Sequence, residues 1–458
     1  MLKFLLTIVT ALQIPVWHIQ TVDSVFPSCD WVQSPDGSSW SISNPDTVPG
    51  RLYITTPQNQ TIYDSGDYLK GESGITIRRR GNTSNFLTKK PYRIKLQSKA
   101  DLLFRGNDNK YKDKDWVLLQ SDSLQTLTGN MLNEMTGMPW TPAMQYVWLE
   151  MNGQDLGLYI LCENVKRNTK CRINVSNLGY IFEYDPYWWN EDYYIPSYFP
   201  NYYNYTLKYP DTDDLLPWQD TYITDAIHQM EQQYRNPEGC LDSLMDIESF
   251  VRWVWVHEIN GDNDYAGSNM YFTKFDTLPT SPIQLACAWD FSGSHKVVND
   301  WVHAHWWFHS FFITVRQYSV IREFVRQYDD VVAPLIPALI DSLTALQSSP
   351  FEAALDTAVS RDNLLYGTSV PTASQQFSRA ISFFTQRSAW LATAIEDYRL
   401  LLMQHDQPTG IDPIRTTGDV RHIIAIYSID GMKRPHLMRG INIVLFSDGT
   451  TEKIMRNE

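Results

Sequence analysis

Apolar and polar residues alternate in short runs through the first half of the chain, and this pattern indicates strands. Four runs have the two-residue period of a half-buried strand: GITIRRRG (74–81), PYRIKLQ (91–97), DWVLLQ (115–120) and GYIFEY (179–184). A longer run (146–165) carries MNGQDLG at its centre, where Asn-Gly is typical of a tight hairpin turn. The residues LTGNMLNEMTG (127–137) have helical spacing instead. The first half therefore predicts an antiparallel sheet interrupted by one helix.

The second half of the chain has mainly the helical period. Residues 219–234 and 246–259 have the pattern of amphipathic helices, and Asp246 is placed as the N-cap of the second one. Two further strands, 269–275 and 283–289, follow with a Pro-containing turn between them. From 304 to 404 nearly all the spacing is helical. The predicted fold class is α+β, with the antiparallel sheet first and helices later.

Both ends of the chain differ from this main domain, which we place at residues 50–405. Residues 23–49 are rich in Ser, Pro and Asp and predict a loose lead-in segment. Residues 406–458 follow a polar linker and contain three short strands separated by Asp-Gly and Arg-Gly turns, which predicts a small all-β appendage. The alternative is that these strands form the last hairpin of the main domain.

The N-terminal residues 1–22 begin with one Lys followed by the apolar run LLTIVTAL, which is the pattern of a secretory signal peptide. The run is shorter than the roughly 20 apolar residues of a membrane span, and no later segment is a candidate span. We therefore expect an exported protein, in the periplasm, on the cell surface or secreted, with surface attachment left open. The same run is also compatible with a buried N-terminal strand or helix.

Charge and cysteine content narrow the range of functions. The formal net charge of −14 argues against nucleic acid as a partner, since such binding requires a basic field, but it is compatible with a local basic pocket. The five cysteines include no C-x-x-C pair, which argues against a zinc or redox site. Cys162 and Cys171 are the pair best placed for a disulfide.

Three polar residues follow the order of the catalytic and metal motifs of protein kinases. Asp264 and Asn269 have the spacing of a catalytic-loop Asp-x4-Asn, and Asp290 lies in an Asp-Phe pair directly after an apolar strand. Phosphoryl transfer needs a carboxylate to orient the attacking hydroxyl and hard oxygen ligands to hold Mg²⁺. Asp264 is the candidate for the first role, and Asn269 with Asp290 for the second. The same residue types are common in surface turns, and we assign Asp262 to such a turn.

A basic strand offers a candidate phosphate-binding lysine. In PYRIKLQ the three apolar residues should share one face, and Arg93 and Lys95 the other. Kinases hold the phosphates of ATP with a strand Lys that a Glu often orients, and Glu163, at the end of another predicted strand, is the candidate partner of Lys95. The alternative is a solvated basic strand face. Other chemistries lack their motifs: His257-Glu258 is not part of H-E-x-x-H, and no G-x-S-x-G is present.

Taken in order, the motifs resemble the spore coat protein H (CotH) kinase family. The resemblance rests on RGNTSNFLTKKPYRIKL (80–96), DWVLLQSDSLQTLTGNMLNEM (115–135), VWLEMNGQDLGLYILCENVKR (147–167), GYIFEYD (179–185), LKYPDTDDL (207–215), DIESFVRWVWVHEINGDND (246–264) and the WDF motif. It is strongest over residues 50–330, with a helical remainder at 331–405. It implies a kinase-like core and an atypical secreted protein kinase that uses ATP and a divalent metal, Mg²⁺ or Mn²⁺, to phosphorylate a protein substrate.

The resemblance also implies roles for individual residues. Asp264 falls where the family has its catalytic-loop aspartate, and Asp290 where it has the metal-binding aspartate of W-D-F-D. Lys95, Glu163 and Lys208 of LKYP fall within matching motifs and are candidates for nucleotide binding.

One departure and one second resemblance affect the functional interpretation. Ser292 replaces the second carboxylate of W-D-F-D, which would weaken or abolish activity if that carboxylate helps to hold the metal. Family members also act as surface proteins that bind host cells. The alternative function is therefore a non-catalytic surface adhesin or pseudokinase that binds a protein or glycan partner through the aromatic segment 186–207. The tail GINIVLFSDGTTEKI (440–454) resembles C-terminal modules of secreted Bacteroidetes proteins, some of which are type IX sorting signals. That resemblance agrees with the predicted signal peptide.

Overall fold

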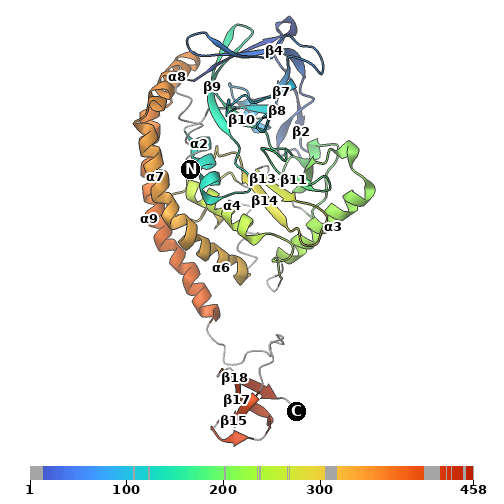
Figure 1. The fold of residues 1–458 in the computed structure, drawn as a ribbon, viewed down its shortest axis with the longest axis vertical. Helices are drawn as coiled ribbons and strands as arrows, with labels where there is room; N and C mark the ends of the chain where they lie inside the picture. The colour runs from blue at the N-terminus through green and yellow to red at the C-terminus, as the bar shows by residue number, and fades with distance from the viewer. Residues whose placement is uncertain are drawn as a thin grey trace. The chain divides into compact units, whose positions relative to one another are not determined.

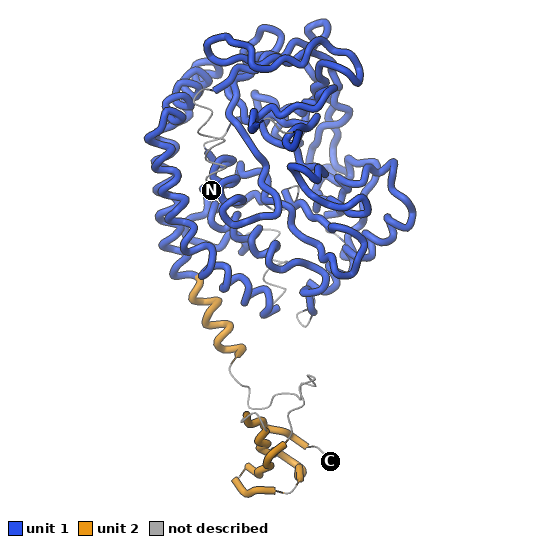
Figure 2. Tube along the Cα trace, in the orientation of Figure 1, with its two compact units in different colours: residues 1–394 blue, residues 395–458 orange. Residues whose placement is uncertain are grey.

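The chain forms two compact units, residues 1–394 and 395–458, which we describe separately (Figure 2). The structure is a computed structural model. It describes residues 14–106, 109–121, 124–200, 203–234, 236, 239–265, 267, 269–304, 317–406, 423–429, 431–434, 436–446 and 450–456.

An eight-stranded sheet makes up the first part of the larger unit (Figure 1). The strand order is β1-β9-β10-β8-β7-β6-β4-β5, and β1 also pairs with β4, so the sheet closes on itself as a barrel. Neighbouring strands are antiparallel, as predicted, except that β1 and β9 are parallel. The strands are β1 (Val16–Thr21), β4 (Val48–Thr55), β5 (Thr61–Asp64), β6 (Ile75–Arg79), β7 (Tyr92–Ala100), β8 (Asp113–Gln120), β9 (Met144–Met151) and β10 (Gln154–Glu163).

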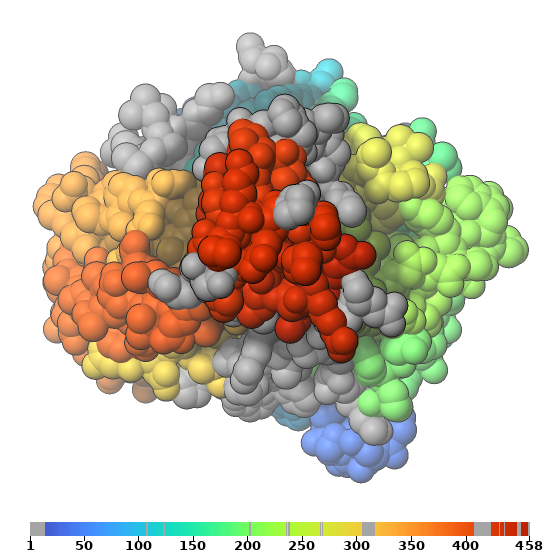
Figure 3. All heavy atoms as spheres, turned by 90° about the horizontal axis from the view of Figure 1, so that it is seen from below, coloured from blue at the N-terminus to red at the C-terminus, as the bar shows by residue number. Residues whose placement is uncertain are grey.

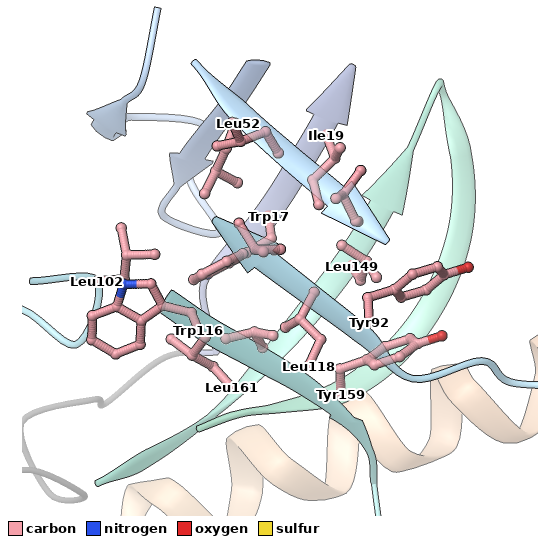
Figure 4. Close-up of a cluster of buried hydrophobic side chains, with 14 of the residues drawn as sticks. Trp17, Ile19, Leu52, Tyr92, Leu102, Trp116, Leu118, Leu149, Tyr159 and Leu161 are labelled. Carbon is pink, nitrogen blue, oxygen red and sulfur yellow. The ribbon is translucent and has the colours of Figure 1, made fainter. Parts of the chain in front are cut away.

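Apolar side chains from alternate strand positions fill the inside of this barrel (Figure 4). Trp17 of β1 and Trp116 of β8 are completely buried there. The predicted apolar face of β7, formed by Tyr92, Ile94 and Leu96, belongs to the same cluster. Burying side chains of this size contributes roughly 1.5–3 kcal/mol each, so the alternation seen in the sequence is what stabilises the barrel.

The N-terminal segments differ in part from their predicted structure. Residues 1–13 lie outside the described residues, so the signal peptide stays a prediction. Val16–Thr21, which the predicted signal includes, is barrel strand β1, in line with the alternative of a buried strand. The lead-in segment 23–49, expected to be loose, contains the hairpin β2 (Asp30–Gln33) and β3 (Trp40–Ser43). Its Ser, Pro and Asp residues lie largely in the turns of this hairpin and around it.

A second sheet, with the order β12-β11-β13-β14, follows the barrel. Helix α4 packs against α2 and β14. It begins where predicted, because the Asp246 side chain accepts hydrogen bonds from the backbone N–H groups of Glu248 and Ser249. The elements of this region are α2 (Gln125–Thr136), β11 (Tyr180–Asp185), β12 (Asn204–Tyr209), α3 (Pro217–Tyr234), α4 (Ile247–Asn260), β13 (Met270–Lys274) and β14 (Ile283–Ala288).

Helices dominate the rest of the larger unit, as the spacing predicted. They are α6 (Tyr318–Gln327), a π-helical turn (Tyr328–Val332), α7 (Ala333–Gln347), α8 (Pro350–Tyr366) and α9 (Ala373–Asp406), whose residues from 395 onward belong to the smaller unit. The barrel and α8 are joined by Lys89, whose Nζ lies 2.7 Å from Asp362 Oδ1. Among the described residues no single helix has the length and apolar composition of a membrane span, although the bent pair Tyr318–Gln347 and Pro350–Tyr366 meets both criteria together. Short 3-10 turns occur at Val22–Ser24, Thr83–Phe86, Trp188–Asn190, Thr212–Asp214 and Val302–Ala304.

The smaller unit contains an antiparallel sheet with the order β16-β15-β17-β18, drawn in red in Figure 3. Its core consists of Ile426, Val444 and Phe446. The strands are β15 (Ile423–Ser428), β16 (Lys433–Arg434), β17 (Gly440–Phe446) and β18 (Thr451–Arg456), one more than predicted. The mixed α+β fold class with a small β-sheet at the C-terminus is therefore confirmed.

The five cysteines carry free thiols, so the disulfide expected between Cys162 and Cys171 is not formed. Cys162 is buried inside β10, whereas Cys171 lies half-buried in the loop that follows. Their closeness in sequence does not bring the two side chains together.

Candidate functional site

The site is organised around the C-terminal end of α4, where Gly261 ends the helix in a left-handed conformation with φ of 56°. Three polar side chains of the last helical turns, His257, Glu258 and Asn260, are buried there. Because buried polar groups must be hydrogen-bonded, each of them holds a different segment of the chain next to the helix end.

His257 holds the loop that carries Asp264. Its Nδ1 lies 3.1 Å from Asp262 Oδ2, and Asp262 Oδ1 accepts the backbone N–H of Asp264 at 3.1 Å. Asp262 therefore does make the predicted turn, but it is completely buried and paired. It fixes the backbone from which the Asp264 side chain extends to solvent.

Asn260 holds the loop that carries Asp290. Asn260 Nδ2 donates to Ser294 Oγ at 2.7 Å, and the hydroxyl of Thr128 on α2 donates to Asn260 Oδ1 at 3.0 Å. Asp290 itself has a positive φ of 56°, and its Oδ1 accepts the backbone N–H of Ser292 at 3.3 Å. This tight turn directs the backbone after β14 back toward α4.

Two glycines allow the loops of Asp264 and Asp290 to approach closely. A Cβ on Gly293 would lie 2.6 Å from Asp264 Cβ and 2.7 Å from its backbone nitrogen, so no larger residue fits there without movement. Gly129 of α2 likewise leaves room for the ring of Phe291. The two loops are therefore in direct contact, and the structure brings the predicted pair Asp264 and Asp290 together.

The electrostatics agree with this convergence. Partial burial raises the pKa of Asp264 to about 6, with the negative charges of Asp290 and Asp262 adding to the rise and Lys296 opposing it. A carboxyl with this pKa is deprotonated at neutral pH yet can accept a proton, as a general base requires.

Asn269 contacts the backbone of Asp264. Its Nδ2 donates to the backbone carbonyl of Asp264 at 2.8 Å, and no described residue donates to its Oδ1. No group of three His, Cys, Asp or Glu that could hold a metal is found within the described ranges. Two carboxylates and an amide oxygen nevertheless fit Mg²⁺ or Mn²⁺, because Mg²⁺ commonly uses one or two carboxylates together with substrate phosphates.

Lys208 forms an ion pair with Glu183 on the neighbouring strand, with Nζ 2.8 Å from Oε2. Burial alone would lower the pKa of Lys208, but Glu183, Asp185 and Glu191 raise it overall. Lys208 is therefore a firmly charged cation on the second sheet.

Tyr187 lies near the strand of this ion pair and near the loop that carries Asp264. Its backbone N–H donates to Asp185 Oδ1 at 2.8 Å. Burial raises the pKa of the Tyr187 phenol, and the carboxylates of Asp264 and Asp185 both lie near enough to add to the rise. Since Asp185 also acts on Lys208, Asp185 and Tyr187 form a polar region that adjoins the ion pair.

The predicted ion pair between Lys95 and Glu163 is not formed. Glu163 is buried and pairs with Arg105, whose Nη1 lies 3.0 Å from Oε1. The strand register explains the error, because Glu163 stands opposite Trp116 and Trp116 opposite Ile94, on the inward face of the barrel. Lys95 is exposed on the other face, as the alternative of a solvated strand face expected.

Sequence reasoning missed several residues that build the site. His257 and Glu258 were considered only as zinc ligands, and Glu183 and Asn260 were not considered. A signal was available in each case, since a charged or amide side chain inside an otherwise apolar helix or strand must find a buried partner.

Comparison with known proteins identifies the family of the chain. The model of the family described as "CotH kinase protein" matches residues 77–342, which include Asp264, Asp290, Asn269 and the Lys208–Glu183 pair. No curated protein matches the chain. Since the matched residues make up more than half of the sequence, the chain belongs to the CotH kinase family.

Proposed function

We propose that the protein transfers the γ-phosphate of ATP to a Ser or Thr hydroxyl of a protein substrate. The observation that carries this proposal is the convergence of Asp264 and Asp290 on two loops in contact, next to the polar region that holds the Lys208–Glu183 pair. Kinase chemistry requires these three functions, a base, metal ligands and a phosphate-binding cation, in one place.

The chain's own residues supply orientation and charge. Asp264 accepts the proton of the acceptor hydroxyl as its oxygen bonds to the γ-phosphorus and the bond from that phosphorus to the β,γ-bridging oxygen breaks, which releases ADP. Asp290 and Asn269 would hold a divalent ion, which when bound neutralises charge on the β- and γ-phosphates. Lys208, oriented by Glu183, binds phosphate oxygens. His257 keeps Asp264 in position through Asp262.

The test is phosphate incorporation from labelled ATP with Mg²⁺ or Mn²⁺, using the full chain. We expect Asp264→Asn and Asp290→Asn each to reduce transfer by on the order of 100-fold or more, since general base catalysis alone is worth about that much. Asp213→Asn, in an exposed turn, is the matched control and should transfer normally. Equal transfer by all four proteins would refute the assigned site.

Ser292 gives a specific reason to keep the non-catalytic alternative, a surface adhesin or pseudokinase. It is exposed beside Asp290, at the position where the family pattern has a second carboxylate. A pseudokinase would bind ATP without transferring phosphate, and an adhesin would not bind ATP. Equilibrium binding of ATP to the full chain, measured beside the transfer assay, separates the three functions.

We further propose that the protein is exported and that its C-terminal β unit acts in sorting. The apolar N-terminal run and the tail GINIVLFSDGTTEKI support this proposal. Cell fractionation followed by N-terminal sequencing of the recovered protein tests it. Recovery of the intact chain from the cytoplasm would contradict it.

A further inference from the structure

The basic stretch of residues 78–96 contains cations with different surroundings. Four of its seven Lys and Arg side chains have polar partners: Arg79 donates to Pro27 O, Lys89 pairs with Asp362, Lys90 donates to Asn85 O and Arg93 pairs with Asp115. The side chains of Arg78, Arg80 and Lys95 form no hydrogen bond or ion pair with any described residue. Structural ion pairs and hydrogen bonds to backbone carbonyls therefore explain the first four residues and leave these three unexplained.

Arg78 and Arg80 differ from Lys95 in their burial. Lys95 is exposed and its charge is solvated by water, whereas Arg78 and Arg80 are both half-buried. Arg78 also stands directly opposite Arg93 in the β6–β7 register, which places two guanidinium groups side by side. Burial lowers the pKa of Arg78, and the charge of Arg93 adds to the effect. Asp115 pairs with Arg93 and only partly offsets the charge of Arg78, and a half-buried guanidinium that no carboxylate contacts is unfavourable unless an anion joins it.

Arg80 is near enough to both sheets of the larger unit for its charge to act on each of them. It follows β6 of the barrel, and its charge acts on Cys162 of β10 and on Tyr271 of β13 in the second sheet. Tyr271 stands opposite Glu183 in the β11–β13 register, and Glu183 pairs with Lys208. Arg78 and Lys208 are linked in the same way, since the carboxylate of Glu191 acts on both. The loop after β6 and the loop that carries Glu191 also meet at Ser41, which donates to Asn82 Oδ1 at 2.5 Å and accepts from Asn190 Nδ2 at 3.1 Å. The three cations therefore border one region, although they come from two sheets.

We propose that Arg78 and Arg80 bind the phosphate oxygens of the nucleotide, opposite Lys208. This inference rests on the proposed kinase function and assigns to β6 the phosphate contact that the sequence had suggested for Lys95. Guanidinium groups suit this task, because their planar donors bind two phosphate oxygens at once and keep their charge when partly buried.

The experiment is equilibrium binding of ATP, pyrophosphate and adenosine to the full chain by titration calorimetry. We expect Arg78→Gln and Arg80→Gln each to weaken ATP and pyrophosphate binding by at least about tenfold, which is the scale of a lost charge-assisted contact, and to leave adenosine binding unchanged. Lys95→Gln is the matched control from the same strands and should bind all three ligands like the wild type.

Thermal unfolding of the same variants without ligand separates a binding role from a structural one. Arg80→Gln should keep or raise the melting temperature, because it removes a charge that has no partner. Arg93→Gln should lower the melting temperature, because it leaves Asp115 with one cation fewer.

The outcomes separate this inference from the proposed function. If the wild type binds ATP and both glutamine variants bind it equally well, the role of Arg78 and Arg80 is refuted while the kinase proposal stands. If the wild type binds neither ATP nor pyrophosphate, both proposals are refuted. If pyrophosphate binding depends on the arginines but ATP binding does not, the pair binds an anion other than the nucleotide, and the assignment fails.

Discussion

Arg387 of α9 contacts Glu258 of α4 twice, with Nε donating to the Glu258 carbonyl at 2.8 Å and Nη2 to its Oε2 at 2.7 Å. Both side chains are almost completely buried. The remaining Arg387 donor, Nη1, reaches the carbonyls of Val298 and Asp300 at 2.9 and 2.6 Å. Arg387 therefore fixes the segment that follows Asp290, although it lies beyond residues 77–342, the part of the chain that matches the family.

Replacing Arg387 should strongly destabilise the larger unit. In Arg387→Met, Glu258 would keep His303 as a partner but lose its buried cation, and breaking a buried pair costs about 3–5 kcal/mol. Arg361→Met is the control, because Arg361 pairs with Asp155 at the surface and such pairs contribute about 0–1 kcal/mol. Chemical denaturation of both variants measures the difference. A loss below about 1 kcal/mol for Arg387→Met would show that the cluster is not stabilising.

Gly293→Ala should impair phosphate transfer more than it impairs folding. The added methyl would press on Asp264 Cβ and on its backbone nitrogen, which the turn made by Asp262 holds in place. We expect transfer to fall by at least about tenfold, with a stability loss of roughly 1–3 kcal/mol, the usual range for overpacking. Asn299→Ala, an exposed position farther along the segment, is the control. Unchanged transfer would mean that the contact between the two loops does not matter for catalysis.

Ser292→Asp should restore a carboxylate beside Asp290. We expect the variant to bind Mn²⁺ roughly tenfold more tightly than the wild type, a gain of about 1.4 kcal/mol, because a charged oxygen replaces a neutral one. Paramagnetic titration with Mn²⁺ measures this without requiring turnover. Ser292→Ala should bind the ion no more tightly than the wild type. Equal affinity in all three proteins would place the ion away from this residue.

Acid should weaken the barrel through Asp115. Burial would raise the pKa of this carboxyl, but Arg93 and Lys166, at 2.7 and 2.6 Å, lower it to about 2. The unfolded chain has a pKa of about 4, so the carboxylate stabilises the fold fully above pH ~4, and this contribution is lost as the pH falls toward 2. It amounts to about 2 kcal/mol.

Urea denaturation between pH 5 and pH 2 measures the contribution of Asp115. Asp115→Asn should be less stable at pH 5 and should lose less stability on acidification than the wild type. The exposed Asp213→Asn should follow the wild-type curve. Parallel curves for all three proteins would contradict the assignment.

The fold should tolerate the removal of N-terminal residues only as far as the start of β1. A chain that begins at residue 14 keeps Val16–Thr21 and should melt like the full chain. A chain that begins at residue 23 lacks the buried Trp17 and exposes the edges of β4 and β9, so we expect aggregation or loss of the cooperative transition. Circular dichroism measures the melting temperature of both proteins. Equal melting temperatures would refute a structural role for β1.

Much of the fold could be predicted from local patterns. The alternation in β7 predicted its buried face, and Asp246 predicted the start of α4. Both predictions succeeded because each depends on residues close together in sequence. Strand β1 was included in the predicted signal peptide because it closely follows an apolar run, and a local pattern carries no information about the pairing partners of a strand. Those partners, β4 and β9, lie far along the chain.

The candidate site, too, could be predicted only in part. Asp264, Asn269 and Asp290 could be proposed because their order along the chain is itself the motif. The partner of Glu163 could not be predicted from the sequence, because a register shift of one residue moves a side chain to the other face of a sheet. The network of His257, Asn260 and Arg387 depends on contacts between α2, α4, α9 and two loops, which no local pattern contains.

The double pairing of β1 has a consequence for the order of folding. Its antiparallel partner β4 ends at Thr55, but its parallel partner β9 ends only at Met151. During synthesis the barrel therefore cannot close until about a third of the chain has left the ribosome, and one edge of β1 waits unpaired until then. Until then the open edge of β1 is available to strands of other chains, so this stage of folding is the one most exposed to aggregation.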